Sequence, residues 1–169
     1  MTSKPKTHEN NDKKDNNKIE VPAFIAIEST LGALSILSMK SKSHRYVFTG
    51  DYEWLFLPPV ALKQFVLFRN NKNEPIAFVS WASVSAEVEK RISSGITKLQ
   101  PKDWNSGDKI YIMDIVSPFA SQKEVLIELN QNQLKDKEVR VLSPKKDGNG
   151  LEIRILSDVI LELKKDKDS

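Results

Sequence analysis

The amino-acid sequence predicts an α+β fold with a mixed, mostly antiparallel sheet flanked by helices. The expected elements follow the order helix, hairpin, helix, strand, helix, strand, strand, which is typical of this class. A dense β-branched run, KIYIMDIV at residues 109–116, marks one central strand. The length of 169 residues suits one domain with one core.

The first helix is expected over residues 21–40, with Pro22 in its first turn. Its apolar side chains recur at helical spacing, at Phe24, Ile27, Leu31 and Leu34. Residues 64–69 and 76–82 then read as two strands. The polar turn between them contains three asparagines and a proline, so the two strands are expected to form an antiparallel hairpin.

The second half of the chain supplies the remaining elements. Residues 83–93 form a short amphipathic helix capped by Ser83 or Ser85, and the central strand 109–116 follows. Next come a helix over 121–134 and two strands over 138–142 and 151–156. The segment 157–165 is expected to be a last helix or a strand.

Composition narrows the function classes. The chain has no cysteine and only two histidines, so disulfides, thiolate catalysis and a metal site are not expected. The 26 basic and 23 acidic residues are interspersed, which argues against a nucleic-acid partner, although the net charge of +3 favours an acidic one. The apolar run near the first helix is interrupted by polar residues, so no stable membrane insertion is expected.

Domain boundaries follow from the two ends of the chain. Residues 1–18 contain no large apolar side chain after the first methionine and are expected to be a disordered tail. The folded domain is expected over 19–163, and residues 164–169 form a charged C-terminal tail. The protein is expected to be cytoplasmic.

Two residues stand out as candidates for chemistry. His8 lies in the tail, which leaves His44 as the one histidine that a rigid shell could orient. Asp114 is a carboxylate in the middle of the central strand, where it is costly unless paired or hydrogen-bonded. Each has a plainer interpretation. His44 could be a surface-loop histidine beside two cations, and Asp114 could be a solvent-facing strand residue. The sequence contains no P-loop, dinucleotide fingerprint or GxSxG elbow.

Four stretches, in order and with their spacing kept, resemble the toxin-activating lysine acyltransferases, which fatty-acylate RTX protoxins in the cytosol. The most specific stretch is Asp103-Trp104-Asn105-Ser106-Gly107-Asp108, followed by Asp114 and by Pro118-Phe119. The other three are residues 31–37 with the loop 41–45, residues 75–84 with Ser80-Trp81-Ala82, and residues 139–141. In the family the loop reads Ser-Pro-Leu-His-Arg, where this chain has Ser41-Lys42-Ser43-His44-Arg45.

The resemblance implies a GNAT-like single domain and an acyl donor that is acyl carrier protein, with no permanently bound cofactor. It implies His44 and Asp114 as the catalytic pair. Four further residues are expected to support or line the site, Ser41, Arg45, Trp81 and Arg140. From the alternation Val139-Arg140-Val141 alone, Arg140 is expected to be a solvent-facing strand residue. The implied partners are a protoxin, acyl carrier protein and a second copy of the chain, as a homodimer.

Two alternatives stay open at this stage. A non-catalytic relative would act as a binding or escort protein, but it would have no need for both His44 and Asp114. An acyltransferase that uses coenzyme A would need a pyrophosphate loop of the type Arg/Gln-x-x-Gly-x-Gly/Ala, which the sequence lacks.

Overall fold

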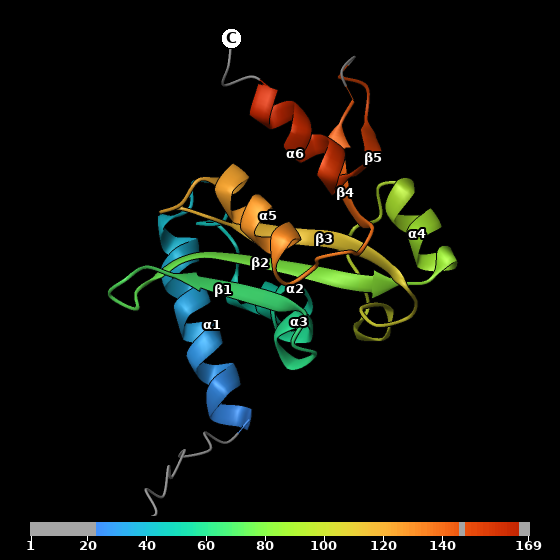
Figure 1. Ribbon diagram of the computed structural model, residues 1–169. Coiled ribbons are helices and arrows are strands. Elements are labelled where there is room, and N and C mark those ends of the chain that lie inside the picture. Colours follow the sequence, from blue (N-terminus) through green and yellow to red (C-terminus); the bar gives the residue numbers. More distant parts are fainter. Residues whose placement is uncertain (1–22, 146–147, 166–169) are drawn as a thin grey trace, which may run out of the picture.

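The computed structural model describes residues 23–145 and 148–165, and its architecture is an α+β fold consistent with a GNAT-like single domain (Figure 1). The predicted tail of residues 1–18 lies outside the described residues. The helices are α1 (Ala23–Lys40), α2 (Tyr52–Leu55), α3 (Leu57–Ala61), α4 (Ala86–Ser93), α5 (Gln122–Gln131) and α6 (Leu156–Lys165). The strands are β1 (Phe65–Arg69), β2 (Pro75–Val84), β3 (Lys109–Val116), β4 (Val139–Pro144) and β5 (Leu151–Ile155).

Most predicted elements are confirmed with small shifts at their ends. The hairpin is β1 and β2, and Ser85 caps α4, because its side chain accepts a hydrogen bond from the backbone N–H of Val88 at 3.3 Å. Helix α5 ends at Gln131, three residues earlier than predicted. The segment left open between helix and strand is helix α6. Helices α2 and α3 were not predicted, because each is about one turn long and too short to show a period.

The strands form one five-stranded sheet in the order β1-β2-β3-β4-β5. Three neighbouring pairs are antiparallel and the β3–β4 pair is parallel, so the mixed, mostly antiparallel sheet is confirmed. Helices α1, α2 and α3 pack on one face through a core that includes Leu34, Leu37 and Phe56. Helices α5 and α6 cover the other face through Leu126, Leu129 and related side chains.

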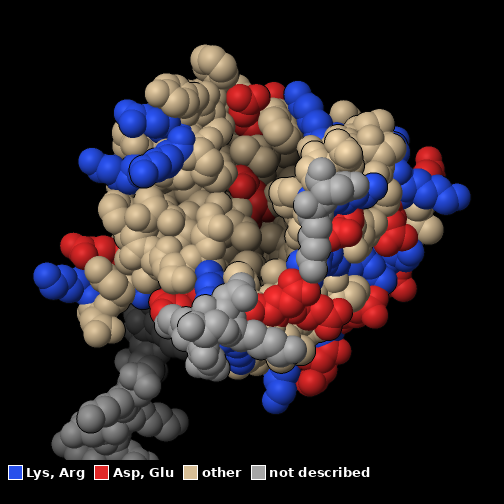
Figure 2. All heavy atoms as spheres, turned by 90° about the horizontal axis from the view of Figure 1, so that it is seen from above, with Lys and Arg blue, Asp and Glu red and all other residues tan. Residues whose placement is uncertain are grey.

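Strands β3 and β4 pair only at their first residues, Ile110 with Val139 and Tyr111 with Arg140. Beyond this point the two strands diverge, and the diverging parts of β3 and β4 are here called the arms of a fork. A cavity of about 490 Å³, here called the fork cavity, lies between the arms and is closed on its sides by α4, α5 and α6. Figure 2 shows a hollow whose walls are mostly uncharged residues, with atoms of Asp or Glu residues at its bottom. The separation therefore opens the sheet at its centre.

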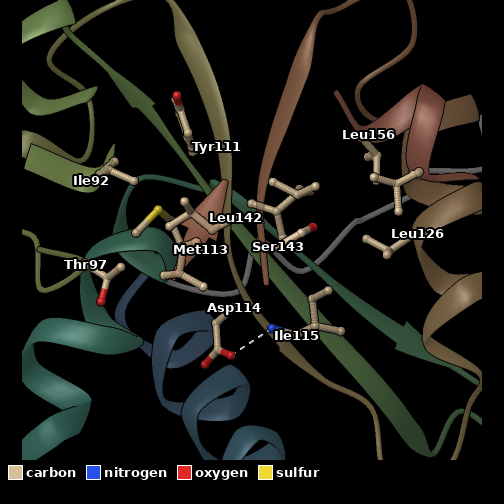
Figure 3. A pocket seen from close by; sticks show the side chains of 14 residues that line it. Ile92, Thr97, Tyr111, Met113, Asp114, Ile115, Leu126, Leu142, Ser143 and Leu156 are labelled. Atoms are coloured by element: carbon tan, nitrogen blue, oxygen red, sulfur yellow. Dashed lines mark hydrogen bonds between the residues drawn. The ribbon is translucent and has the colours of Figure 1, made fainter. Parts of the chain in front are cut away.

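The fork cavity is lined mainly by apolar side chains from both arms. Figure 3 shows Asp114 on one side of the cavity and Tyr111 on the opposite side, with Met113 and Leu142 between them. Helix α4 contributes Ile92 at the same end as Tyr111. The cavity thus carries one ionisable carboxylate at one side of a predominantly apolar space.

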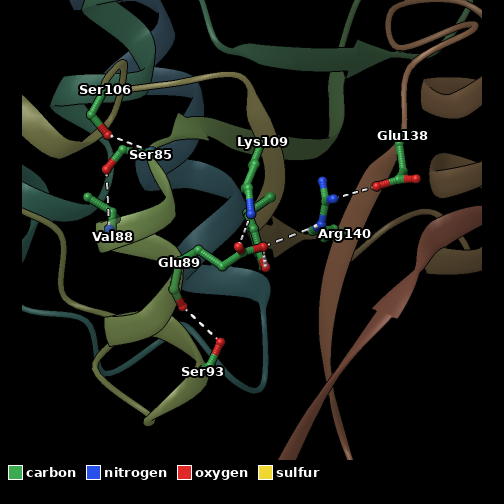
Figure 4. Close-up of polar contacts among 9 residues, drawn as sticks. Ser85, Val88, Glu89, Ser93, Ser106, Lys109, Glu138 and Arg140 are labelled. Carbon is green, nitrogen blue, oxygen red and sulfur yellow. Dashed lines mark hydrogen bonds and ion pairs between the residues drawn. The ribbon is translucent and has the colours of Figure 1, made fainter.

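A polar cluster holds the closed end of the fork (Figure 4). Glu89 on α4 accepts a hydrogen bond from the Tyr111 hydroxyl at 2.7 Å and pairs with Lys109 and Arg140, so it joins α4 to both strands. Arg140 also pairs with Glu138. Its side chain is only 20% exposed, so the expectation of a solvent-facing strand residue was wrong. Its pairing with Tyr111 in the β3–β4 ladder places its guanidinium 6.0 Å from the Tyr111 ring centroid.

The pKa of Glu89 lies below its ordinary value, mainly because Lys109 donates a hydrogen bond to the charged carboxylate; burial opposes this shift, and Tyr111 and Arg140 reinforce it. Burial and the hydrogen bond to Glu89 raise the pKa of Tyr111, so its hydroxyl stays a donor. A carboxyl whose pKa is lowered by folding stabilises the fold above its ordinary pKa of 4.5 and loses that contribution as the pH falls through its folded-state pKa.

We predict that Glu89→Gln lowers the free energy of unfolding by on the order of 1–3 kcal/mol at neutral pH, because Lys109 and Arg140 lose their anion. The difference from wild type should shrink as the pH falls below the ordinary pKa of 4.5, and it should vanish below the lowered folded-state pKa of Glu89, where the native protein is protonated there as well. Urea unfolding of both proteins at a series of pH values measures this difference in the free energy of unfolding. Glu87→Gln, an exposed change on the same helix, should follow the wild-type profile. A constant difference at every pH would contradict the role assigned to the Glu89 charge.

Gly107 lies in the turn that leads into β3, where its backbone N–H donates to the Ser83 carbonyl at 3.1 Å. A Cβ at this position would lie 2.5 Å from the carbonyl oxygen of Val84 and 2.6 Å from Cα of Ser85. The backbone of β2 and the turn therefore leave no room for a side chain. Gly32 in helix α1 is the opposite case, since a Cβ there meets nothing within 4 Å.

We predict opposite effects of the same substitution at these two glycines. Gly107→Ala should destabilise the protein by about 1–3 kcal/mol, because backbone atoms have to move. Gly32→Ala should stabilise it by about 0.5–1 kcal/mol, because alanine is the better helix former. Thermal unfolding of both variants compares them directly, and equal shifts of Tm in the same direction would refute the packing described for the turn.

Candidate active site

A tight turn after α1 places His44 against the sheet. The backbone N–H of Ser41 still donates to the Leu37 carbonyl at 3.0 Å, and the N–H of Arg45 donates to the Ser41 carbonyl at 3.1 Å. These bonds fold residues 41–45 back on the end of the helix. The His44 side chain is consequently directed inward and is 12% exposed.

A β-bulge directs Asp114 toward the same face of the sheet. Ser80 of β2 is paired with Asp114, whereas the next residue, Trp81, is paired with Ile112, so Met113 is an extra residue in β3. Cross-strand partners share a face, and Ser80 points toward the side that carries α1. The bulge therefore lets Asp114 share this face with Tyr111, although three residue steps separate them.

His44 and Asp114 form a direct contact across 70 residues of chain. The Nε2 atom of His44 lies 2.9 Å from Oδ1 of Asp114, which is 15% exposed, and the backbone N–H of Ile115 donates to the same oxygen at 2.8 Å. An ionised carboxylate can only accept, so Nε2 carries the proton in this contact. In the neutral ring Nδ1 is then the free base.

Two hydroxyl groups meet that basic nitrogen. Oγ of Ser41 lies 3.0 Å and Oγ of Ser43 lies 2.9 Å from Nδ1 of His44, and the two hydroxyl oxygens are 3.1 Å apart. With Nε2 protonated, Nδ1 offers a single lone pair, so one of the two hydroxyls donates to it while the other can donate to the neighbouring hydroxyl oxygen. The ring is thus fixed from both sides, by a carboxylate at one nitrogen and by hydroxyls at the other.

Two buried polar atoms next to this contact have no hydrogen-bond partner among the described residues. They are Oδ2 of Asp114 and Oγ of Ser80, which belong to paired residues of neighbouring strands. Unpaired buried polar groups cost about 1–3 kcal/mol each and are rare in folded proteins. The two unpaired atoms therefore lower the stability of this part of the sheet.

The pair lies between two hollows. Asp114 lines the fork cavity, and His44 lines a second cavity of about 350 Å³ between α1 and the loop that follows it. Leu31, Met39 and Tyr52 contribute to the walls of this second cavity. Each member of the imidazole–carboxylate pair therefore borders a different cavity.

The remaining candidates occupy different places. Ser41 contacts His44, whereas the Arg45 guanidinium lies 5.5 Å from the Tyr46 ring centroid and borders the second cavity. Trp81 packs against the core on the α5 side of the sheet. Arg140 belongs to the polar cluster at the closed end of the fork. Of the six candidates, His44, Asp114 and Ser41 come together in direct contact.

Ser43 is a contact of His44 that sequence reasoning did not single out. Its place in the sequence could have indicated this contact, because a serine directly before the histidine in a tight turn can reach the ring. Among the described residues, no three His, Cys, Asp or Glu side chains gather as they would around a metal ion. No helix in the described ranges combines the length and apolar character that crossing a membrane requires.

Comparison with known proteins connects this geometry to one family. The family model described as "RTX toxin acyltransferase family" matches residues 25–157. The lysine-acyltransferase RtxC of Vibrio cholerae is 33% identical over 105 residues, which cover 62% of this chain and 69% of that protein. The protein-lysine myristoyltransferase HlyC of Escherichia coli is 35% identical over 90 residues, 53% of this chain and 51% of its own length.

A third relative extends the match further along the chain. The RTX-II toxin-activating lysine-acyltransferase ApxIIC of Actinobacillus pleuropneumoniae is 29% identical over 121 residues, covering 70% of this chain and 75% of that protein. The matched share of these relatives' own lengths thus ranges from about half to three quarters. The family match spans the turn with His44, the strand with Asp114 and the whole fork. This chain belongs to the RTX toxin acyltransferase family.

Proposed function

We propose that this chain is a protein-lysine fatty acyltransferase that moves an acyl chain from acyl carrier protein to lysine side chains of an RTX protoxin. The observation that carries the proposal is the His44–Asp114 contact of 2.9 Å, set between an apolar cavity and a second hollow. Membership of an acyltransferase family and relatives named for lysine acylation support the same reaction class.

His44 is the general base in this proposal. Lysine is protonated at neutral pH, and its amine attacks an acyl carbonyl carbon only after losing a proton. The Nδ1 atom of His44 accepts a proton from the attacking amine, and Asp114 stabilises the resulting imidazolium through Nε2. Ser41 holds the ring from the other side. The resemblance also assigns supporting roles to Arg45, Trp81 and Arg140, and of these Arg45 lies nearest to the pair along the chain.

The fork cavity is proposed to receive the fatty chain. Its walls are apolar side chains of β3, β4, α4, α5 and α6, with Asp114 at one side. Burying each methylene group of an acyl chain there is worth about 0.8 kcal/mol, so such a cavity favours a long chain over an acetyl group. The thioester carbon then lies at the His44–Asp114 side.

Acyl carrier protein is the proposed donor. Three exposed cations, Lys40, Lys42 and Arg45, surround His44 in sequence, and they provide a positive rim for an acidic carrier. A cytoplasmic location and a homodimer remain proposals taken from the resemblance. The outer face of α1 offers exposed apolar side chains for a subunit contact, Phe24, Ile25, Ile36 and Met39.

We predict that His44→Ala lowers lysine acylation by about 10²–10⁴-fold, because the base is lost. Asp114→Asn should also be severely impaired, and the double variant should be little worse than His44→Ala, because the residues act as a unit. The measurement is mass spectrometry of an RTX protoxin co-expressed with each variant. His8→Ala removes the only other histidine and should keep full activity. Unmodified lysines with the wild-type chain would refute the function, and full activity of His44→Ala would refute the mechanism.

We predict that acyl carrier protein is used far better than coenzyme A as the carrier of the same acyl group. Lys42→Glu should raise KM for acyl carrier protein and reduce the salt dependence of turnover, because a cation of the rim becomes an anion. Lys90→Glu makes the same charge change on α4, on the opposite side of the molecule in Figure 1, and should leave KM unchanged. Equal use of acyl-coenzyme A in purified assays would contradict the choice of donor.

A further inference from the structure

Three side chains form a continuous hydrogen-bonded path from the surface into the sheet. Oγ of Ser43 is 2.9 Å from Nδ1 of His44, and Nε2 of the same ring is 2.9 Å from Oδ1 of Asp114. A hydroxyl, an imidazole and a carboxylate in this connectivity activate the hydroxyl as a nucleophile, because the ring accepts its proton and the carboxylate stabilises the charged ring. The path therefore has the parts needed for covalent acyl transfer.

Ser43 and Ser41 contact the same nitrogen, but they differ in accessibility. Ser41 is 7% exposed and lies under the turn that follows α1. Ser43 is exposed, so its hydroxyl can meet a carbonyl carbon arriving from solvent. The two hydroxyl oxygens are 3.1 Å apart, so when Ser43 donates to Nδ1 the buried Ser41 hydroxyl can donate to Oγ of Ser43 and orient it without itself being reached by substrate.

The resemblance to the acyltransferases does not assign a role to Ser43. The family loop has leucine at the place that Ser43 occupies in Ser41-Lys42-Ser43-His44-Arg45. A leucine side chain could not hydrogen-bond Nδ1. The contact at 2.9 Å is therefore a property of this chain's own sequence.

We propose that Ser43 is the nucleophile of this site and carries the acyl group as an ester between the donor and the acceptor lysine. This inference rests on the acyl-transfer function proposed above. In the first half-reaction, Oγ of Ser43 attacks the thioester carbonyl carbon while its proton passes to Nδ1 of His44. The C–S bond then breaks, and the imidazolium returns the proton to the departing thiolate, which leaves as a thiol.

The second half-reaction reverses the roles. A neutral lysine amine attacks the ester carbonyl carbon, and Nδ1 of His44 takes one proton from the nitrogen. The C–O bond to Ser43 breaks, the proton passes to the serine oxygen, and an amide and the free hydroxyl result. Water in place of the amine releases the fatty acid. The same base thus serves both steps, and the thiol carrier can leave before the protoxin lysine arrives.

The test uses the full chain and an acyl–acyl carrier protein donor in the absence of any acceptor. After an acid quench, peptide mass spectrometry should find one acyl group on Ser43. Ser43→Ala should lose the adduct, and its rate of lysine acylation should fall by about a hundredfold or more. Ser29→Ala changes an exposed serine of α1 and should behave as wild type.

Ser43→Cys provides a chemical signature that a structural role would not give. The chain has no other cysteine, so a thioester can form only at the substituted position. Its adduct should be cleaved by neutral hydroxylamine, whereas the serine ester of the wild-type chain should resist it. An adduct on His44 instead, or a Ser43→Ala variant that acylates lysine at the wild-type rate, would overturn the nucleophile assignment.

The outcomes separate this inference from the proposed function. Lysine product at the normal rate from Ser43→Ala keeps the acyltransferase and removes only the Ser43 intermediate. An acyl group on Ser43 with no lysine product from any protoxin supports the nucleophile and overturns the proposed acceptor. Neither adduct nor product from the wild-type chain would overturn both.

Discussion

The short parallel pairing of β3 with β4 determines where the fork cavity opens and therefore where Asp114 lies. Two residue pairs hold the strands together, and the Glu89 cluster anchors them there by joining α4 to Lys109, Tyr111 and Arg140. Because pairing stops at Tyr111, the following residues of β3 have a cavity rather than a strand on one side. A carboxylate in mid-strand is tolerated at Asp114 because this opening and a histidine partner are both available.

The orientation of His44 decides which atom can perform chemistry. In the serine hydrolases the carboxylate contacts Nδ1 and leaves Nε2 as the base. Here Asp114 contacts Nε2 and leaves Nδ1 as the base, facing the hydroxyls of Ser41 and Ser43. The edge of the ring that carries Nε2 therefore faces the sheet, and the edge that carries Nδ1 faces the serines of the turn. The unpaired Oδ2 of Asp114 and Oγ of Ser80 show that local stability is sacrificed beside this contact.

The sequence predicted the fold class, the hairpin and the central strand because each shows a hydrophobic period or a run long enough to read. It pointed to His44 through the scarcity of histidine and to Asp114 through the cost of a charge in a strand. It could not predict the bulge at Met113, because an extra residue in one strand is defined only by its partner strand. Arg140 was misjudged as solvent-facing for the same reason, since Glu89 meets it from a different helix.

The mechanism requires that Asp114 fixes the His44 ring with Nδ1 as the free base. Nitrogen NMR of ¹⁵N-labelled protein at neutral pH tests it directly, because the chain has only two histidines and His8→Ala assigns the signals. We expect a His44 ring with the proton on Nε2 and an unprotonated, hydrogen-bonded Nδ1. We also expect Asp114→Asn to disturb this tautomer. A proton found on Nδ1 of neutral His44 would contradict the mechanism at its foundation.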